Sequence, residues 1–199
     1  MGNQAKFDRA NVVEKAKNLY WEKGFHATSM RNLQDVIDMR PGSIYSAFGS
    51  KENLFKEALN RYSADFDERI ANCINSDLSP LSALRSFVKA SVIDSRHSAP
   101  SGMCMLVKTV GELTEDNHEL LTEAKRLLKN VETQFAKVIE LAINKGELDC
   151  SIDPIKTARY LQIQVIGLRT YIRANDNEQD AIELLNDIFD TGPLKQVKY

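Results

Sequence analysis

The chain has 199 residues, a length that suits one domain or two small ones sharing a core. Apolar residues make up 43% and charged residues 27%, which excludes a disordered or fibrous protein. Nine glycines and five prolines are few chain breakers, and this argues against an all-β fold and for long helices. The formal charge of −2 by itself gives no indication of a nucleic-acid partner.

Targeting signals and metal-binding motifs are not evident in the sequence. No apolar run approaches the roughly 18 residues that a membrane span requires, and the N-terminal residues show no signal-peptide pattern. The cysteines Cys73, Cys104 and Cys150 are too few and too widely spaced for a disulfide framework, which fits a reducing compartment. The three histidines belong to no metal motif. We therefore expect a cytoplasmic protein without metal, cofactor or membrane contact.

Apolar residues recur at three- and four-residue steps along nearly the whole chain, which predicts an all-α fold with about nine helices and no strand. Gly24 is placed to end the first helix. Asp116 with Glu119 predicts a capping box before the seventh helix, and Asn175 predicts the cap of the ninth. The expected helices cover about residues 7–23, 30–37, 41–48, 51–75, 80–96, 103–113, 117–145, 154–174 and 176–191.

The second and third expected helices, with the short turn between them, have the layout of a helix-turn-helix motif. Such a motif places the start of its second helix against base edges in the DNA major groove. Small residues at that start permit close approach to the duplex, and Tyr45 offers a hydroxyl and a flat apolar face. Thr28 and Lys51 begin flanking helices, where free N–H groups favour phosphate. The expected DNA contacts are Thr28, Arg31, Arg40, Pro41, Gly42, Ser43, Tyr45, Ser46 and Lys51.

A longer pattern contains these residues: Gly24-Phe25-x-x-Thr28-Ser29-Met30-Arg31, then Pro41-Gly42-Ser43-Ile44-Tyr45-x-x-Phe48-x-Ser50-Lys51-Glu52-x-Leu54. It resembles the DNA-binding domain of TetR-family transcriptional regulators over about residues 7–59. One departure is Ala47, where many relatives carry histidine. The resemblance implies a DNA-binding domain at residues 1–50, joined by the helix at 51–75 to an effector-binding and dimerisation domain over residues 51–199.

The resemblance implies a homodimer that binds palindromic double-stranded DNA, most often as a repressor, is released by a small-molecule effector, and has no enzymatic activity. Two alternatives stay open, namely a helical protein-interaction module and a helical enzyme. An enzyme would draw on the acids Glu112, Glu115, Asp116 and Glu119. We interpret these acids as solvated side chains that complement helix dipoles.

The effector site is less well marked in the sequence. The stretch around Cys104 is similar to a TetR subgroup in which a cysteine at the start of the sixth helix responds, in some members, to electrophiles or oxidants. The position near a helix N-terminus, with Lys108 one turn on, favours a reactive thiol, and a buried structural cysteine is the alternative. Polar residues within apolar helices are further candidates. The candidate effector contacts are Cys104, Lys108, Gln134, Phe135, Tyr160 and Gln164, with a dimer seam as an equal alternative for Gln164.

The last two expected helices carry more apolar surface than one core requires, and the run at residues 160–168 is apolar on nearly all sides. Two helices from each chain would form a four-helix bundle under twofold symmetry. The expected interface consists of Leu161, Val165, Leu168, Leu184, Leu185 and Ile188.

Charge is divided unevenly along the chain. Residues 1–62 hold ten basic and seven acidic side chains, and residues 63–199 hold sixteen basic and twenty-one acidic ones. A weakly basic DNA-binding part must therefore depend on a few well-placed contacts rather than on a strong overall field.

Overall fold

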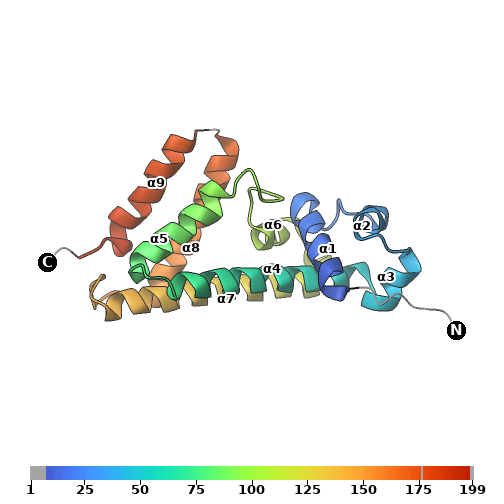
Figure 1. The fold of residues 1–199 in the computed structure, drawn as a ribbon, viewed down its shortest axis with the longest axis horizontal. Coiled ribbons are helices and arrows are strands. Elements are labelled where there is room, and N and C mark those ends of the chain that lie inside the picture. The colour runs from blue at the N-terminus through green and yellow to red at the C-terminus, as the bar shows by residue number, and fades with distance from the viewer. Residues whose placement is uncertain (1–7, 176, 198–199) are drawn as a thin grey trace.

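The computed structural model describes residues 8–175 and 177–197, and the regular secondary structure in this part of the chain is all helical (Figure 1). Its nine α-helices, one π-helical turn and two short 3₁₀ turns, without a strand in the described ranges, confirm the expected all-α fold. The helices are α1 (Arg9–Lys23), α2 (Met30–Ile37), α3 (Pro41–Phe48), α4 (Lys51–Ile74), α5 (Pro80–Lys89), α6 (Met105–Glu112), α7 (His118–Asn144), α8 (Pro154–Ala174) and α9 (Glu178–Asp190).

The molecule is elongated, and the two long helices α4 and α7 run side by side along its length (Figure 1). Helices α1, α2 and α3 lie at one end and, with the first turns of α4, form what we call the head. Helices α5, α8 and α9 lie at the other end and form, with the rest of α4 and α7, the body. The short helix α6 lies between the head and the body.

Local capping explains most of the helix boundaries. Ser29 and Asn32 form a capping box at α2, and the Ser50 hydroxyl accepts a hydrogen bond from the backbone N–H of Asn53 at the start of α4. The predicted box at Asp116 and Glu119 is wrong, because a 3₁₀ turn over Glu115–Asn117 leads into α7 without a side-chain cap.

Two other boundaries differ from the sequence expectation. Asn177, not Asn175, caps α9, because the Asn175 amide already donates to the Tyr171 carbonyl at the end of α8. Helix α5 stops at Lys89 and continues as a π-helical turn over Ala90–Asp94. Such a turn widens the backbone, and it contains the buried residue Ser91.

Two hydrophobic clusters form the core. The first joins the inner faces of α1–α3 to Leu54, Phe55, Ala58 and Leu59 of α4, and it also includes residues of α6 and of the first half of α7. The second joins α5, the second half of α7, α8 and α9. The head therefore shares one continuous core with α6 and α7, which restrains its orientation relative to the body.

No helix within the described ranges is both long enough and apolar enough to cross a membrane.

Glu112 at the end of α6 is not solvated as expected from the sequence. Its carboxylate accepts hydrogen bonds from the backbone N–H groups of Phe25, at 3.0 Å, and His26, at 2.7 Å. Gly24, which ends α1, has φ +90°, and a Cβ there would lie 2.5 Å from Glu112 Oε2. The turn thus requires glycine both for its backbone conformation and for the close approach of the carboxylate.

Replacing Gly24 with alanine should lower the free energy of unfolding by about 1–3 kcal/mol, since alanine is strained at this φ and displaces Glu112. Gly111→Ala is the matched control, because a Cβ at Gly111 meets no atom within 4 Å and alanine favours the helix. Urea unfolding of both variants measures the difference, and equal stability of the two would contradict this account.

Candidate DNA-binding surface and effector cavity

Helix α3 presents a polar face to solvent, while its apolar face packs against the core of the head. Ile44 and Phe48 are buried against the head core. On the other side Tyr45 keeps 49% of its surface exposed, and its neighbours are exposed as well. The exposed residues on and next to α3 are Arg40, Pro41, Gly42, Ser43, Tyr45 and Ser46. This is the geometry that a recognition helix needs, because its reading side chains are free and its backbone is fixed.

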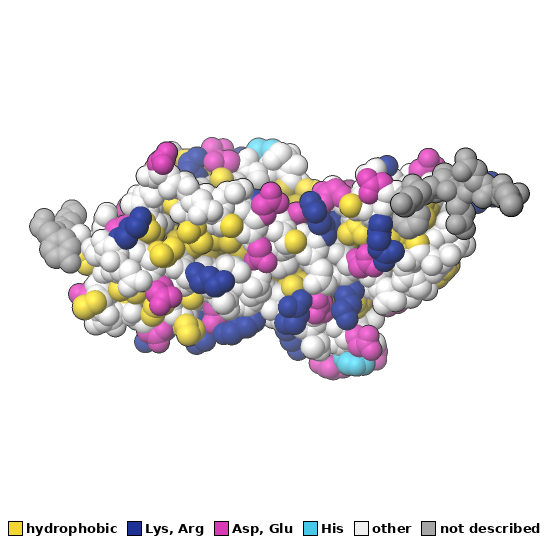
Figure 2. All heavy atoms as spheres, turned by 60° about the horizontal axis from the view of Figure 1, so that its bottom comes forward, with side chains coloured by type: hydrophobic (Ala, Val, Ile, Leu, Met, Phe, Trp, Pro, Cys, Tyr) yellow, Lys and Arg dark blue, Asp and Glu magenta, His cyan; other side chains and the backbone are white. Residues whose placement is uncertain are grey.

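Arg31 of α2 and Arg40 before α3 are both exposed, and neither forms an ion pair with any described residue. Their guanidinium groups are therefore available to phosphate or to guanine. On the face of the molecule shown in Figure 2, acidic and basic side chains are interspersed, and no extended field of one sign covers it. A few placed cations on the head must then suffice.

Thr28 and Lys51 are placed differently from the other expected contacts. The Thr28 side chain is fully buried, and its hydroxyl donates to the Gly24 carbonyl at 2.6 Å. In this structure the Thr28 hydroxyl has no exposed surface to offer to DNA, and the expected contact stays a prediction. Lys51 Nζ donates to the Phe25 carbonyl at 2.7 Å and lies 4.2 Å from the Phe25 ring centroid. Burial lowers the pKa of Lys51, and a phosphate would have to compete with these two contacts.

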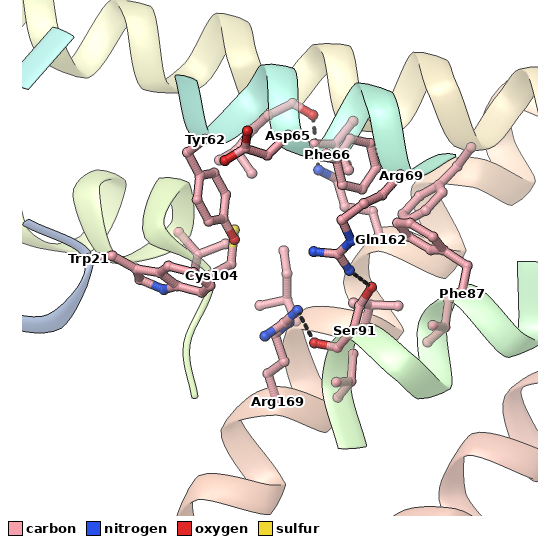
Figure 3. Close-up of a pocket in the computed structure, with 18 of the residues that line it drawn as sticks. Trp21, Tyr62, Asp65, Phe66, Arg69, Phe87, Ser91, Cys104, Gln162 and Arg169 are labelled. Carbon is pink, nitrogen blue, oxygen red and sulfur yellow. Dashed lines mark hydrogen bonds between the residues drawn. The ribbon is translucent and has the colours of Figure 1, made fainter. Parts of the chain in front are cut away.

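A cavity of about 290 Å³ lies where the head meets the body, and Figure 3 shows its walls. Helices α1, α4, α5, α6, α7 and α8 and the π-helical turn all contribute to it. Most of the wall is apolar, with three phenylalanines from α4, α5 and α7 packed edge to face. The polar groups that face it come chiefly from Lys17, Tyr62, Asp65, Arg69, Gln162 and Arg169. Apolar walls with a few convergent polar groups are typical of small-molecule sites.

Cys104 and Phe135, two of the candidate effector contacts, both line this cavity. The Cys104 side chain lies against the Tyr62 hydroxyl (Figure 3). Burial, followed by the effect of Cys104, raises the pKa of Tyr62 well above its ordinary value. Gln162 of α8 also lines the cavity and donates to the Leu128 carbonyl at 3.0 Å.

Four predicted effector contacts are not part of the cavity wall. Lys108 is turned toward α1, as described below, and Gln134 bonds along α7 to Asn130 and Lys137. Tyr160 and Gln164 line an outer groove between α8 and α9. Contrary to the prediction, these residues do not share one cavity with Cys104. A polar residue within an apolar helix does not show which side of the helix borders a cavity.

The expected interface residues are mostly internal. Leu161, Leu168, Leu185 and Ile188 are buried in the chain's own core, and Val165 lines the cavity; only Leu184 is exposed. This part of the prediction is wrong because α8 is apolar around most of its circumference, so periodicity does not select one face. The exposed face of α8 and α9 is formed instead by Tyr160, Ile163, Gln164, Tyr171 and Leu184.

Helix α6 contacts the head through polar groups that sequence reasoning missed. Lys108 Nζ donates to the carbonyls of Trp21, at 2.8 Å, and Glu22, at 2.9 Å. These carbonyls lie in the last turn of α1, where a cation is favoured. Trp21 Nε1 donates to the Met103 carbonyl at 2.6 Å, just before α6. No local sequence signal reveals contacts between residues so far apart in the chain.

Comparison with known proteins identifies a family to which this chain is similar. Residues 12–58 match the family described as bacterial regulatory proteins, tetR family, and residues 80–186 match the tetracyclin repressor-like C-terminal domain. The uncharacterized HTH-type transcriptional regulator YezE of Bacillus subtilis (strain 168) is 24% identical over 194 residues, which cover 96% of this chain and 100% of YezE.

The HTH-type transcriptional repressor ComR of Escherichia coli (strain K12) is 25% identical over 169 residues, or 84% of this chain and 80% of ComR. A cysteine mutant of the TetR family transcriptional regulator CifR, solved in complex with 26-bp operator DNA, has the same fold, with a TM-score of 0.82 and 21% identity over 94% of this chain and 97% of that one. The C-terminal match alone spans more than half of the sequence. The chain belongs to the TetR family of bacterial regulatory proteins.

Proposed function

We propose that the protein is a cytoplasmic transcriptional repressor that binds a palindromic operator as a homodimer and leaves it when a small molecule occupies the central cavity. The exposed polar face of α3, held by a buried apolar face, is the observation that carries the proposal. Membership of a regulatory family supports this function over catalysis. We divide the chain functionally into a DNA-binding part at residues 1–50 and an effector-binding and dimerisation part over residues 51–199.

Tyr45→Ala should weaken operator binding about tenfold or more, because it removes an exposed reading side chain, while the free energy of unfolding stays unchanged. Leu141→Ala is the control, since Leu141 is an exposed apolar residue of α7 in the body. Fluorescence anisotropy with the protein's own upstream DNA, measured at several salt concentrations, reports the affinity. A Tyr45→Ala protein with unchanged affinity would remove α3 as the reader, and binding without salt dependence would favour an interaction module or an enzyme.

The outer face of α8 and α9 is the proposed dimer surface. It contains Ile163, 60% exposed, and Tyr171 and Leu184, each 37% exposed. The groove between the two helices lies on the same side. A second copy of the chain would cover this face by twofold symmetry and would set the two heads at a fixed distance for a palindrome.

Ile163→Asp should convert the dimer to a monomer and abolish operator binding, since an unpaired carboxylate buried at the seam costs several kcal/mol. Leu78→Asp is the matched control, because Leu78 is 50% exposed but lies in the connection between α4 and α5. Sedimentation velocity at micromolar concentration distinguishes the two states. A dimeric Ile163→Asp protein would contradict the proposed surface.

A route from the cavity to the head runs through α6. Its first turn lines the cavity with Cys104 and Val107, and its Lys108 and Glu112 hold the end of α1 and the turn that follows. A ligand that displaces the first turn must therefore move or release the head.

The position of Cys104 in the cavity wall supports an electrophilic effector as a second candidate. Addition of the thiol across the double bond of N-ethylmaleimide would place a bulky group in the cavity. In a Cys73→Ser, Cys150→Ser protein, we expect this reagent to lower operator affinity at least tenfold, and Cys104→Ser in the same background to abolish the response. A full response without Cys104 would show that the cysteine is structural.

A further inference from the structure

Two guanidinium groups face the central cavity from opposite walls. Arg69 comes from α4 and Arg169 from α8, and Figure 3 shows them converging on Ser91 of the π-helical turn. Arg69 donates to the Ser91 hydroxyl, and Arg169 donates to the Ser91 carbonyl at 2.6 Å. Because both guanidinium groups donate to Ser91, which is uncharged, the two cations are held close to one another. Burial lowers the pKa of Arg69 and the charge of Arg169 acts in the same direction, while Tyr62 and Asp65 act against them.

Neither guanidinium is matched by a carboxylate of its own. Within the described residues, Arg69 and Arg169 form no ion pair. Asp65 lines the same cavity, but Lys17 holds it at 2.5 Å and Arg61 at 2.9 Å. Asp65 is therefore paired with other cations, and Lys17, Asp65, Arg69 and Arg169 together leave the cavity wall with an excess of two positive charges. Partly desolvated cations in this state favour an anionic partner.

Hydrogen-bonding capacity also remains in this pair. A guanidinium carries five N–H donors in a planar fork. Arg69 uses one nitrogen, for Ser91, and Arg169 uses two, for the Ser91 and Gly102 carbonyls. The remaining donors suit the two oxygens of a carboxylate, which guanidinium groups bind in a bidentate manner.

The rest of the wall is apolar and largely aromatic. Phe66 stands at the centre of a cluster in which its ring centroid lies 5.5 Å from that of Phe87 and 5.8 Å from that of Phe135. Trp21 faces the cavity from α1. A small inorganic anion would leave this surface uncovered, whereas a molecule with an apolar body would cover it.

We propose that the effector is a small organic acid whose carboxylate lies between Arg69 and Arg169 and whose apolar body packs against the phenylalanine cluster and Trp21. The role of this acid as an effector rests on the proposed function, whereas its binding in the cavity does not. Arg169 also holds the Gly102 carbonyl, in the loop that leads into α6. A carboxylate that draws on Arg169 therefore acts directly on the segment that holds the head.

Trp21 is the only tryptophan of the chain and lies in the cavity wall, so its fluorescence reports occupancy. The probes are benzoate, 3-phenylpropanoate, hexanoate and octanoate, each paired with its primary amide, together with inorganic phosphate. At least one acid should change the fluorescence saturably and raise the melting temperature of the full-length protein. Its amide should bind roughly tenfold to a hundredfold more weakly, the range for losing charge-assisted hydrogen bonds.

Arg69→Gln and Arg169→Gln should each weaken binding of that acid about tenfold or more and reduce its advantage over the amide. Arg173→Gln is the matched control, because Arg173 lies one turn further along α8, is exposed and does not line the cavity. If either cavity variant fails to fold, the comparison of acid with amide in the unaltered protein decides the question.

Three results would overturn the proposal: no acid binds, each amide binds as tightly as its acid, or phosphate competes as well as the best acid. Operator affinity is measured separately on the same preparations without any acid. Acid binding without operator binding would sustain this inference and refute the proposed function. Operator binding without acid binding would refute this inference and sustain the proposed function.

Discussion

The last turn of α1 and the turn after it lie against side chains of α6, and the placement of the whole head follows from this contact. Lys108 satisfies carbonyls at the C-terminus of α1, and Glu112 satisfies two N–H groups beyond it. Both are charge-assisted hydrogen bonds to backbone groups, which are stronger than neutral ones. Because the backbone of the turn is held directly, Gly24 must stay small, and α2 and α3 are oriented relative to the body as a unit.

The same helix begins in the cavity wall, which makes the arrangement suitable for a switch. To move a two-state equilibrium from 1:99 to 99:1, a ligand needs about 5.5 kcal/mol of differential affinity. Hydrogen bonds to charged groups contribute about 1.5–3 kcal/mol each. A carboxylate that engages Arg69 and Arg169 in only one of two head positions would supply a difference of that order. Burial of an apolar body would add to the affinity and would add to the switching only where the two states differ.

Features encoded locally could be predicted from the sequence, and features encoded by packing could not. The helices and the exposed face of α3 follow from caps, breakers and periodicity. The burial of Thr28, whose hydroxyl donates to the Gly24 carbonyl at the end of α1, is not revealed by the sequence. Periodicity selects Leu161 and Leu168 of α8 for an interface although they lie in the chain's own core, because that helix is apolar nearly all round. The pairing of Arg69 with Arg169 depends on how α4, α8 and the π-helical turn pack together, and periodicity does not detect that packing.

The proposed DNA-binding surface and the proposed acid site both bind an anion, and the net charge of the protein contributes little to either. Residues 63–199 hold twenty-one acidic against sixteen basic side chains, so their long-range field does not attract an organic acid, and residues 1–62 are only weakly basic. In each place the attraction comes from cations that form no ion pair among the described residues. Arg31 and Arg40 form none, and Asp65 pairs with Lys17 and Arg61 rather than with Arg69. Selectivity then comes from geometry, because a misplaced anion meets the acidic surroundings without the compensating contacts.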